Sequence, residues 1–335
     1  MKMEKIIAKL CDKDGISDIH IHAGLPIAIR VYGNIEKIDD EIIEKDEINK
    51  FIKSVLNTSQ FKIFSDEKSF DCSFTIGKIR MRANMFESMH GPSLALRVLE
   101  DNIRDFHEVG FPPVIEELIT KRNGLILVTG PTGSGKSTSL AAMINYLNEN
   151  HAMNIITIED PIEYIHANKQ AIISQREVGA HTSSFASALR AALREDPDAI
   201  LVGELRDIET ITLALTAAET GHMVFATLHT NGAPQTINRI IDVFPGDQRE
   251  QVRQQLSTTL RVAVTQRLIK RMDGVGRVPA FEVMVCNSAV KNLIREDKVF
   301  QIPSIMQTGA SDGMIRMEST LDQLKADGII SYDEE

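Results

Sequence analysis

A glycine-rich turn between an apolar strand and a helix constrains this chain more than any other feature. Residues 130–138 read GPTGSGKST, after the apolar run GLILVTG and at the start of the helical pattern GKSTSLAAMINYLNEN. The spacing G-x-x-x-x-G-K-[ST] lets backbone amides curl around a β-phosphate, while Lys136 neutralises phosphate oxygens and Ser137 offers a hydroxyl to magnesium. The sequence therefore predicts a P-loop for ATP and Mg²⁺ rather than an accidental glycine turn. The predicted nucleotide contacts are Gly130, Pro131, Thr132, Gly133, Ser134, Gly135, Lys136, Ser137 and Thr138.

From Pro113 onward, short apolar runs alternate with helical patterns. NIITIED, AILVG and MVFATLH read as buried strands, and SSFASALRAALRED and DIETITLALTAAETG read as helices between them. Strands that are separated by helices of this length form βαβ units around a parallel sheet. We therefore expect an α/β domain over residues 113–335, with a helical segment at its C-terminal end.

Residues 1–100 follow a different pattern, in which apolar and polar side chains alternate. In FDCSFTIGKIRMRANMF, Met81 and its apolar neighbours at period two share one face of a strand, which leaves Arg80 and Arg82 on the other. Arg97 lies opposite the apolar residues of LALRVL in the same way. The pattern predicts a small α+β domain with an arginine-bearing sheet face, which serves either solubility or a ligand.

Turn residues mark two connections in this half of the chain. Gly33 and Asn34 stand between two alternating runs and predict the turn of a hairpin. Residues 101–112 read DNIRDFHEVGFP, with Gly110 and the start of a Pro-Pro pair, and predict a linker between the two domains.

Length and composition exclude several classes of protein. A chain of 335 residues exceeds the size at which one core keeps growing, so two domains are expected. The chain has no run of eighteen apolar residues, and charges interrupt its start, so we expect neither a membrane span nor a secretory signal. Cys11, Cys72 and Cys286 are too scattered for a disulfide framework and read as reduced thiols. A net charge of −10 argues against nucleic acid as the main partner.

The strand NIITI ends in IEDPIEY, residues 158–164, with three acids in five positions. Ligands of parallel sheets bind outside the carboxyl ends of the strands, so these acids face the same crevice as the P-loop. Glu163 lies beyond Pro161, in a segment that can arch over the γ-phosphate, and is the candidate for polarising water. Glu159 and Asp160 suit magnesium binding or loop anchoring. The alternative is three solvated acids on a loop.

Further candidates end two other strands. DAILVGELRD ends near Glu204, where P-loop ATPases place an acid that organises magnesium or water; the alternative is a helix-capping acid beside Arg206 and Asp207. His229 follows the strand MVFATL and can sense phosphate, whereas His222 precedes it, about 20 Å away by strand geometry. A lone histidine at a strand end is most often a hydrogen-bonded surface residue.

Taken together and in order, four segments resemble the Walker A, Asp box, Walker B and His box of secretion-type hexameric ATPases. They are GPTGSGKST, IEDPIEY, ALREDPDAILVGELRD and TGHMVFATLHT. The resemblance continues through SDIHIHAGLPIAIRVYG and AVKNLIREDK, so it covers nearly the whole chain, and it is strongest to the motors that retract type IV pili. It implies an α/β fold class, with a RecA-like P-loop ATPase domain and a smaller α+β PAS-like N-terminal domain.

The resemblance also implies roles for individual residues. Glu163 is the implied catalytic glutamate, and Glu204 is the Walker B acid that holds magnesium together with Ser137. His222 and His229 are the implied His-box pair. The arginines implied to reach the nucleotide, in trans or from the other domain, are Arg80, Arg82 and Arg97.

The resemblance further implies a homohexameric motor that hydrolyses ATP to retract pili and drive twitching motility. Such rings are cytoplasmic and peripheral at the inner-membrane base of the pilus, where they work with the platform protein and other pilus ATPases. Retraction is favoured over assembly because the long N-terminal extension and four-cysteine insert of assembly ATPases are missing. AVKNLIREDK, residues 289–298, also resembles the AIRNLIRE segment of retraction motors, with Val290, Lys291 and Asp297 as departures. The alternative for this segment is a plain amphipathic helix.

Other functions remain to be distinguished. Within the family, the chain could be an accessory retraction paralogue, or a type II secretion or pilus assembly ATPase. A DNA-translocating RecA-like hexamer shares the P-loop, but the acidic composition disfavours it. A nucleotide-gated scaffold with little turnover is disfavoured by the presence of both Glu163 and Glu204.

Overall fold

The computed structural model describes residues 2–99, 102–274 and 276–333. The chain divides into two compact units, the first comprising Met1–Asn102 and Pro161–Ile165 and the second comprising Ile103–Asp160 and His166–Glu335. The border predicted between residues 100 and 101 falls outside the described residues. Each unit contains one sheet and its own hydrophobic core.

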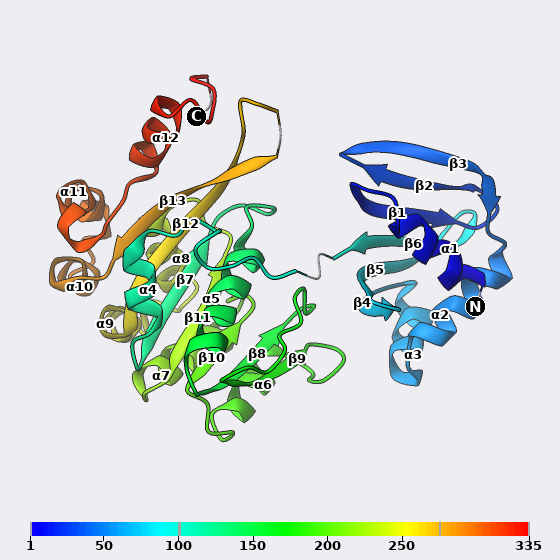
Figure 1. The fold of residues 1–335 in the computed structure, drawn as a ribbon. Helices are drawn as coiled ribbons and strands as arrows, with labels where there is room; N and C mark the ends of the chain where they lie inside the picture. Colours follow the sequence, from blue (N-terminus) through cyan, green and yellow to red (C-terminus); the bar gives the residue numbers. More distant parts are fainter. Residues whose placement is uncertain (1, 100–101, 275, 334–335) are drawn as a thin grey trace. The chain divides into compact units, whose positions relative to one another are not determined.

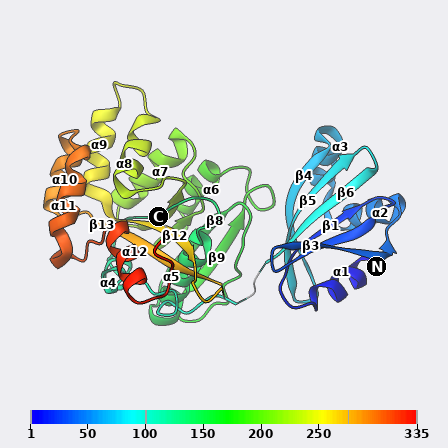
Figure 2. The ribbon, with the colours of Figure 1, turned by 90° about the horizontal axis from the view of Figure 1, so that it is seen from above.

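The first unit contains a six-stranded antiparallel sheet in the order β3-β2-β1-β6-β5-β4. Its strands are β1 (Ile16–His22), β2 (Pro26–Val31), β3 (Asn34–Ile42), β4 (Ser69–Ile76), β5 (Ile79–Ser88) and β6 (Gly91–Val98). Its helices are α1 (Lys2–Cys11), α2 (Lys45–Val55) and α3 (Thr58–Glu67). Figure 2 shows the three helices on the same side of this sheet. This arrangement confirms the predicted PAS-like α+β domain.

The two faces of the first sheet differ as the alternating pattern predicts. Met81 and Met85 of β5 are fully buried in a core that also holds Phe51 of α2. Arg80 and Arg82 occupy the intervening positions of β5 and are half-buried. Because successive residues of a strand point to opposite faces, the arginines lie on the side away from this core.

The turn between β2 and β3 differs from the prediction by one residue. Val31 pairs with Asn34, so the two-residue loop is Tyr32-Gly33 rather than Gly33-Asn34. Both loop residues have positive φ, 47° and 88°, as the turns that match the twist of a hairpin require. The prediction failed because Tyr32 is a residue type that rarely adopts this conformation.

The second unit contains a seven-stranded sheet in the order β13-β12-β7-β11-β10-β8-β9 (Figure 1). Its strands are β7 (Gly124–Thr129), β8 (Asn154–Glu159), β9 (Ile172–Glu177), β10 (Ala199–Val202), β11 (Met223–Leu228), β12 (Leu260–Lys270) and β13 (Arg277–Val285). Neighbouring strands from β12 to β9 run parallel, and β13 runs antiparallel to β12. The parallel sheet confirms the predicted α/β domain.

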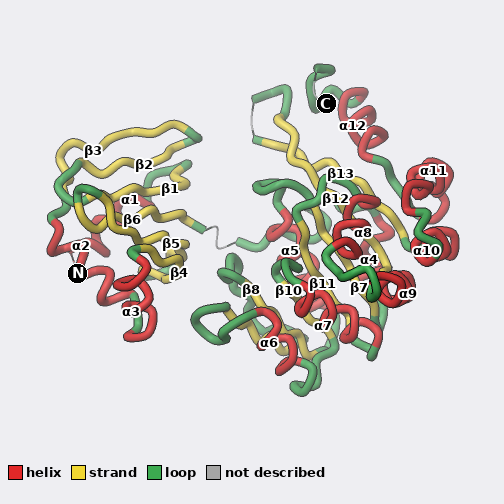
Figure 3. The backbone as a smooth tube through the Cα atoms, turned by 180° about the vertical axis from the view of Figure 1, so that it is seen from behind, coloured by secondary structure: helices red, strands yellow, loops and turns green. Residues whose placement is uncertain are grey.

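Helices cover both faces of this sheet, which makes a three-layer domain (Figures 2 and 3). They are α4 (Pro113–Ile119), α5 (Lys136–Asn150), α6 (Phe185–Ala192), α7 (Ile208–Glu219), α8 (Ala233–Asp242), α9 (Arg249–Thr259), α10 (Ser288–Arg295), α11 (Ile302–Thr308) and α12 (Met317–Ala326), with 3-10 turns at Val299–Gln301 and Gly309–Asp312. Leu125 and Leu127 of β7 pack in the core that contains α6 to α11, whereas Ile126 and Val128 pack with α4 and α5. None of the described helices combines the length and apolar character needed to span a membrane.

The segment that precedes α4 is more ordered than a linker. Phe106 and Val109 are 4% and 6% exposed and belong to the core beneath α4 and α5. The ring of Phe106 lies 4.9 Å from the ring of Tyr146 in α5, measured between centroids. The second unit therefore starts at Ile103, and the linker predicted over residues 101–112 is shorter than expected because its apolar side chains are buried.

The segment AVKNLIREDK forms most of α10 and the turn that follows it. Val290 and Ile294 are fully buried, and Leu293 packs against the same core. The segment therefore has the geometry of an amphipathic helix, and its link with retraction stays a prediction.

Candidate functional site

The P-loop connects the end of β7 to α5, which begins at Lys136. Gly130, Gly133 and Gly135 have φ angles of 140°, 78° and 87°, a range that residues with a Cβ rarely adopt. The backbone amides of such a turn can converge on an anion. The amides of the first helical turn can join them, because they have no partners inside the helix. The geometry of the loop therefore suits a bound phosphate.

Lys136 folds back over this loop. Its Nζ donates to the carbonyl oxygens of Gly130 at 2.8 Å and Pro131 at 2.9 Å. The same Nζ lies 3.4 Å from Nδ1 of His229. Because an ammonium group can only donate, Nδ1 accepts, and the proton of a neutral ring lies on Nε2.

Glu204 extends this contact into a continuous polar array. Its Oε1 lies 3.3 Å from His229 Nε2, and its Oε2 accepts a hydrogen bond from Arg206 at 2.7 Å. Lys136, His229 and Glu204, which belong to three separate motifs, therefore form one chain of contacts across the ends of three parallel strands. The sequence predicted each residue separately, and the structure brings them together.

Backbone hydrogen bonds hold Glu204 in this place. The Gly203 amide donates to the Ile158 carbonyl at 2.8 Å, and the Leu205 amide donates to the Thr227 carbonyl at 3.1 Å. The Thr227 hydroxyl donates in turn to the Gly203 carbonyl at 2.5 Å. The segment after β10 is thus tied to β8 on one side and to β11 on the other, which fixes the direction of the Glu204 side chain.

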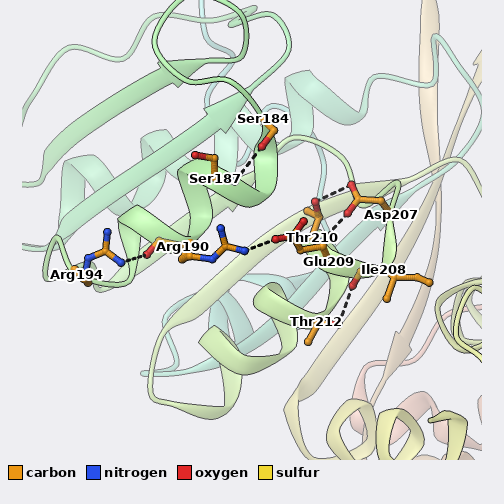
Figure 4. A network of polar contacts seen from close by, with 9 residues as sticks. All are labelled: Ser184, Ser187, Arg190, Arg194, Asp207, Ile208, Glu209, Thr210 and Thr212. Carbon is orange, nitrogen blue, oxygen red and sulfur yellow. Dashed lines mark hydrogen bonds and ion pairs between the residues drawn. The ribbon is translucent and has the colours of Figure 1, made fainter. Parts of the chain in front are cut away.

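Asp207, not Glu204, caps the helix that follows (Figure 4). Its Oδ1 accepts a hydrogen bond from the Thr210 amide at 2.8 Å at the start of α7. Arg190 of α6 forms an ion pair with Glu209 in the first turn of α7. The helix-capping alternative for Glu204 is therefore wrong.

The surroundings of Glu204 favour its ionised form. Burial opposes ionisation, but the hydrogen bond and charge of Arg206, together with His229, outweigh it and hold the pKa of this carboxyl below its usual value. A carboxylate that stays ionised provides the oxygen ligands that Mg²⁺ prefers. The Ser137 hydroxyl is of the same oxygen-donor type, so these residues fit the ion that accompanies ATP. The described part of the chain contains no cluster of three or more His, Cys, Asp or Glu side chains suited to a metal of its own.

The lowered pKa of Glu204 makes a prediction about stability. A carboxyl whose pKa is lower in the folded than in the unfolded state stabilises the fold above its ordinary pKa of 4.5 and loses that contribution as the pH falls through the folded-state value. We expect Glu204→Gln to be less stable than wild type at neutral pH and equally stable in strong acid. Urea unfolding across this pH range measures the difference, with exposed Glu108→Gln as the control. A difference that persisted unchanged in acid would contradict the prediction.

Two of the three acids of IEDPIEY, Glu159 and Glu163, have different surroundings. Glu159 Oε1 accepts hydrogen bonds from the Thr157 hydroxyl at 2.6 Å and from Gln175 Nε2 at 3.2 Å, so it anchors the end of β8. Glu163 is half-buried and lies in Pro161–Ile165, which belongs to the first compact unit. Its placement over the γ-phosphate stays a prediction.

His222 has a structural environment at the opposite end of β11. Its Nδ1 lies 2.9 Å from the Ala217 carbonyl and 3.3 Å from the Thr220 hydroxyl, at the end of α7. Its own carbonyl accepts a hydrogen bond from the Gly124 amide at 3.1 Å. With β11 between them, His222 and His229 are about 20 Å apart. His222 therefore does not reach the P-loop of its own chain, and its His-box role stays a prediction.

The three predicted arginines lie on neighbouring strands of the first unit. Arg97 Nε donates to Asp18 at 2.9 Å, and Arg80 donates to the Ser73 hydroxyl at 2.9 Å. Arg82 pairs with Arg97 in the register of β5 and β6. The structure thus places the three side chains on one face, and their contact with nucleotide stays a prediction.

Two buried polar residues beneath the P-loop were not predicted. Ser139 of α5 donates its hydroxyl to Gln266 Oε1 of β12 at 2.6 Å. Gln266 is 3% exposed and, with Thr265, ends the buried run of residues 262–266 in β12. A polar residue at an inward position of such a strand is the signal that could have revealed it.

Glu282 of β13 joins two helices near the same loop. Its Oε1 accepts a hydrogen bond from the Ala233 amide at 2.7 Å, at the start of α8, and the Met317 backbone at the start of α12 also favours the ionised carboxylate. Burial raises the pKa of Glu282 above its usual value despite these donors. It lines a cavity of about 560 Å³ that also borders Pro131 and Arg316.

Comparisons with known proteins find relatives over nearly the whole chain. Residues 3–296 match the family described as type II/IV secretion system protein. The chain is 48% identical over 304 residues to a "Twitching motility protein" of Neisseria gonorrhoeae, covering 90% of this chain and 81% of that protein. It is 48% identical over 320 residues to the "Type IV pilus retractation ATPase PilT" of Pseudomonas aeruginosa, covering 95% and 93%.

A solved structure is similar over almost the whole chain. The crystal structure of the pilus retraction motor PilT with bound ADP matches at a TM-score of 0.91 and 47% identity, covering 99% of this chain and 95% of that chain. These matches confirm the resemblance predicted from the four motifs. The chain therefore belongs to the family of type II/IV secretion system proteins.

Proposed function

We propose that this protein is an ATPase whose ATP hydrolysis powers type IV pilus retraction and twitching motility. The contact array of Lys136, His229 and Glu204 is the observation that carries the ATPase assignment. It joins a phosphate-binding loop to an ionised acid through a histidine that contacts both. Two relatives that are 48% identical over at least 90% of this chain are named for twitching motility and pilus retraction. Their names support retraction as the process that this ATPase powers.

Each residue of the array has a distinct task in this proposal. Lys136 exchanges its loop carbonyl partners for the β- and γ-phosphate oxygens of ATP. His229 then loses the ammonium contact on Nδ1. Because its Nε2 contacts Glu204, the binding of phosphate in the loop changes the surroundings of Glu204 through the imidazole. Ser137 and Glu204 supply oxygen atoms for Mg²⁺, which neutralises phosphate charge when it is bound. Glu163 polarises the attacking water.

The proposal includes assembly and location. The working form is a homohexamer in which arginines from the first unit, Arg80, Arg82 and Arg97, complete the nucleotide site. The ring acts in the cytoplasm, at the inner-membrane base of the pilus, against the platform protein and beside other pilus ATPases. Nucleic acid has no part in this cycle.

Lys136→Ala in the host gene tests the proposal, because removal of the ammonium group abolishes phosphate binding and leaves the core unchanged. We expect excess surface pili together with lost twitching motility. Pilus counts by electron microscopy and colony spreading measure the two effects. Lys121→Ala is the control, because Lys121 forms an exposed ion pair with Glu117.

Other outcomes would identify the alternatives. Bald cells would mean that the protein powers pilus assembly. Normal pili and motility would assign it to another secretion machine or to an accessory role. DNA-stimulated ATP hydrolysis with steep salt dependence would indicate a DNA translocase instead.

A further inference from the structure

Gln266 lies directly beneath the P-loop, although it is distant from it in sequence. Strand β12 runs parallel to β7, and Thr265 is paired with Thr129, the last residue before the loop. The hydroxyl groups of these two threonines lie 2.9 Å apart and are fully buried. Gln266, the next residue of β12, therefore lies beside the point where β7 ends and the P-loop begins at Gly130.

Gln266 approaches the P-loop at two glycines and contacts the helix behind it. Gln266 Oε1 accepts the hydroxyl of Ser139, which is fully buried in α5. A Cβ atom built on Gly130 would lie 2.2 Å from the backbone oxygen of Gln266, and one built on Gly135 would lie 2.9 Å from its Nε2. The first glycine of the loop, the last glycine and the helix behind them all pack against Gln266.

On its outer side the loop is held by the Lys136 ammonium group, which binds the carbonyl oxygens of Gly130 and Pro131. Pro131, Thr132 and Gly133 are exposed, so no apolar core holds the loop from outside. A buried side-chain amide is costly unless it is hydrogen-bonded, and a bonded one fixes its neighbours in a single arrangement. Gln266 is buried and its Oε1 is hydrogen-bonded to Ser139, so its side chain can fix the inner side of the loop.

We propose that Gln266 is a positioning residue that holds the P-loop in its phosphate-binding shape before nucleotide arrives. It fixes the distance between Gly130 and Gly135 and the start of α5, so that the loop amides converge without further ordering. Binding then costs less conformational entropy, which raises affinity for nucleoside di- and triphosphates. The identity of this ligand rests on the proposed ATPase function, whereas the shape of the empty loop does not.

Gln266→Met tests the proposal, because methionine keeps the volume of the side chain and removes both polar atoms. In the nucleotide-free protein, we expect faster amide hydrogen exchange over residues 130–139 than in wild type. We also expect about tenfold weaker binding of a fluorescent ATP analogue, the effect of losing one hydrogen bond. The melting temperature without nucleotide should fall by a few degrees, because the buried Ser139 hydroxyl loses its acceptor.

Two further variants separate positioning from a general loss of stability. Thr265→Val removes an equally buried polar group from the neighbouring position of β12 and should lower the melting temperature without changing nucleotide affinity. Ser139→Ala removes the donor to Gln266, so it should weaken binding in the same direction. The double variant Ser139→Ala/Gln266→Met should bind no more weakly than Gln266→Met alone, because both changes remove the same hydrogen bond.

The outcomes distinguish this proposal from the proposed function. Unchanged exchange over residues 130–139 in Gln266→Met would overturn the positioning role whatever the nucleotide result. An equal loss of affinity in Thr265→Val would also overturn it. If wild type bound no nucleotide but Gln266→Met still exchanged faster over the loop, the ATPase proposal would fail and the positioning role would stand.

Discussion

Glu163→Gln is expected to lower the rate of ATP hydrolysis about a hundredfold or more, while ATP still binds. A glutamine amide has nearly the same shape as the carboxylate but cannot accept a proton from the attacking water. Because the P-loop and the Lys136 contacts are unchanged, phosphate binding should persist. Steady-state phosphate release measures turnover, and titration with a fluorescent ATP analogue measures binding.

The exposed pair of Glu117 and Lys121 provides a matched control for this experiment. Glu117→Gln makes the same chemical change on the surface of the second unit and should leave both turnover and binding unchanged. If Glu163→Gln hydrolysed ATP as fast as wild type, Glu163 would have no part in activating water. Glu204 would then be the next candidate for that step.

Gly130→Ala is expected to weaken nucleotide binding a hundredfold or more and to destabilise the protein by about 1–3 kcal/mol. Gly130 has a φ of 140°, which a residue with a Cβ does not adopt without strain. The new methyl group would lie 2.2 Å from the Gln266 backbone oxygen and 2.8 Å from the Ser134 hydroxyl oxygen. Strand pairing holds Gln266 in place, so the loop itself must move. Calorimetric titration with ADP and thermal unfolding measure the two effects.

Gly246→Ala is the control for this substitution. No atom lies within 4 Å of the position of its added Cβ, and its φ lies outside the range that excludes L residues. We expect it to bind ADP normally. Normal ADP binding by Gly130→Ala would show that the loop can tolerate displacement from β12, and the role given to that strand would have to be withdrawn.

The sequence was most informative where a period or a motif records burial directly. The alternation around Met81 identified the buried face of β5, because each inward side chain must be apolar to pack against the helices. The spacing of the P-loop glycines predicted a strand before them and a helix after them, and β7 and α5 occupy those places. In both cases a local pattern follows from one physical requirement, which is burial of one face for β5 and a phosphate-binding turn for the P-loop.

Other features depend on contacts between distant segments, which no local pattern contains. The sequence of an apolar strand does not show whether the strand runs parallel or antiparallel to its neighbour. The antiparallel direction of the edge strand β13 could therefore not be predicted. Phe106 and Val109 read as parts of a linker until the core that buries them was known. Gln266 is one of several polar residues in β12, and only its contact with Ser139 behind the P-loop distinguishes it from the others.

The carboxylate of Glu282 gives the last helix a particular place in the order of folding. Its Oε1 binds the first residue of α8, and the first residue of α12, 84 positions later in the chain, lies near enough for its backbone to favour the ionised carboxylate. Leu321 of α12 packs with Ile269 of β12 and Ala280 of β13, so the helix has its docking site only after these two strands have paired. Long-range closures of this kind form late and open early. We therefore expect the C-terminal helix to be the first part of the second unit to detach when the protein is strained, while the sheet that carries the P-loop remains intact.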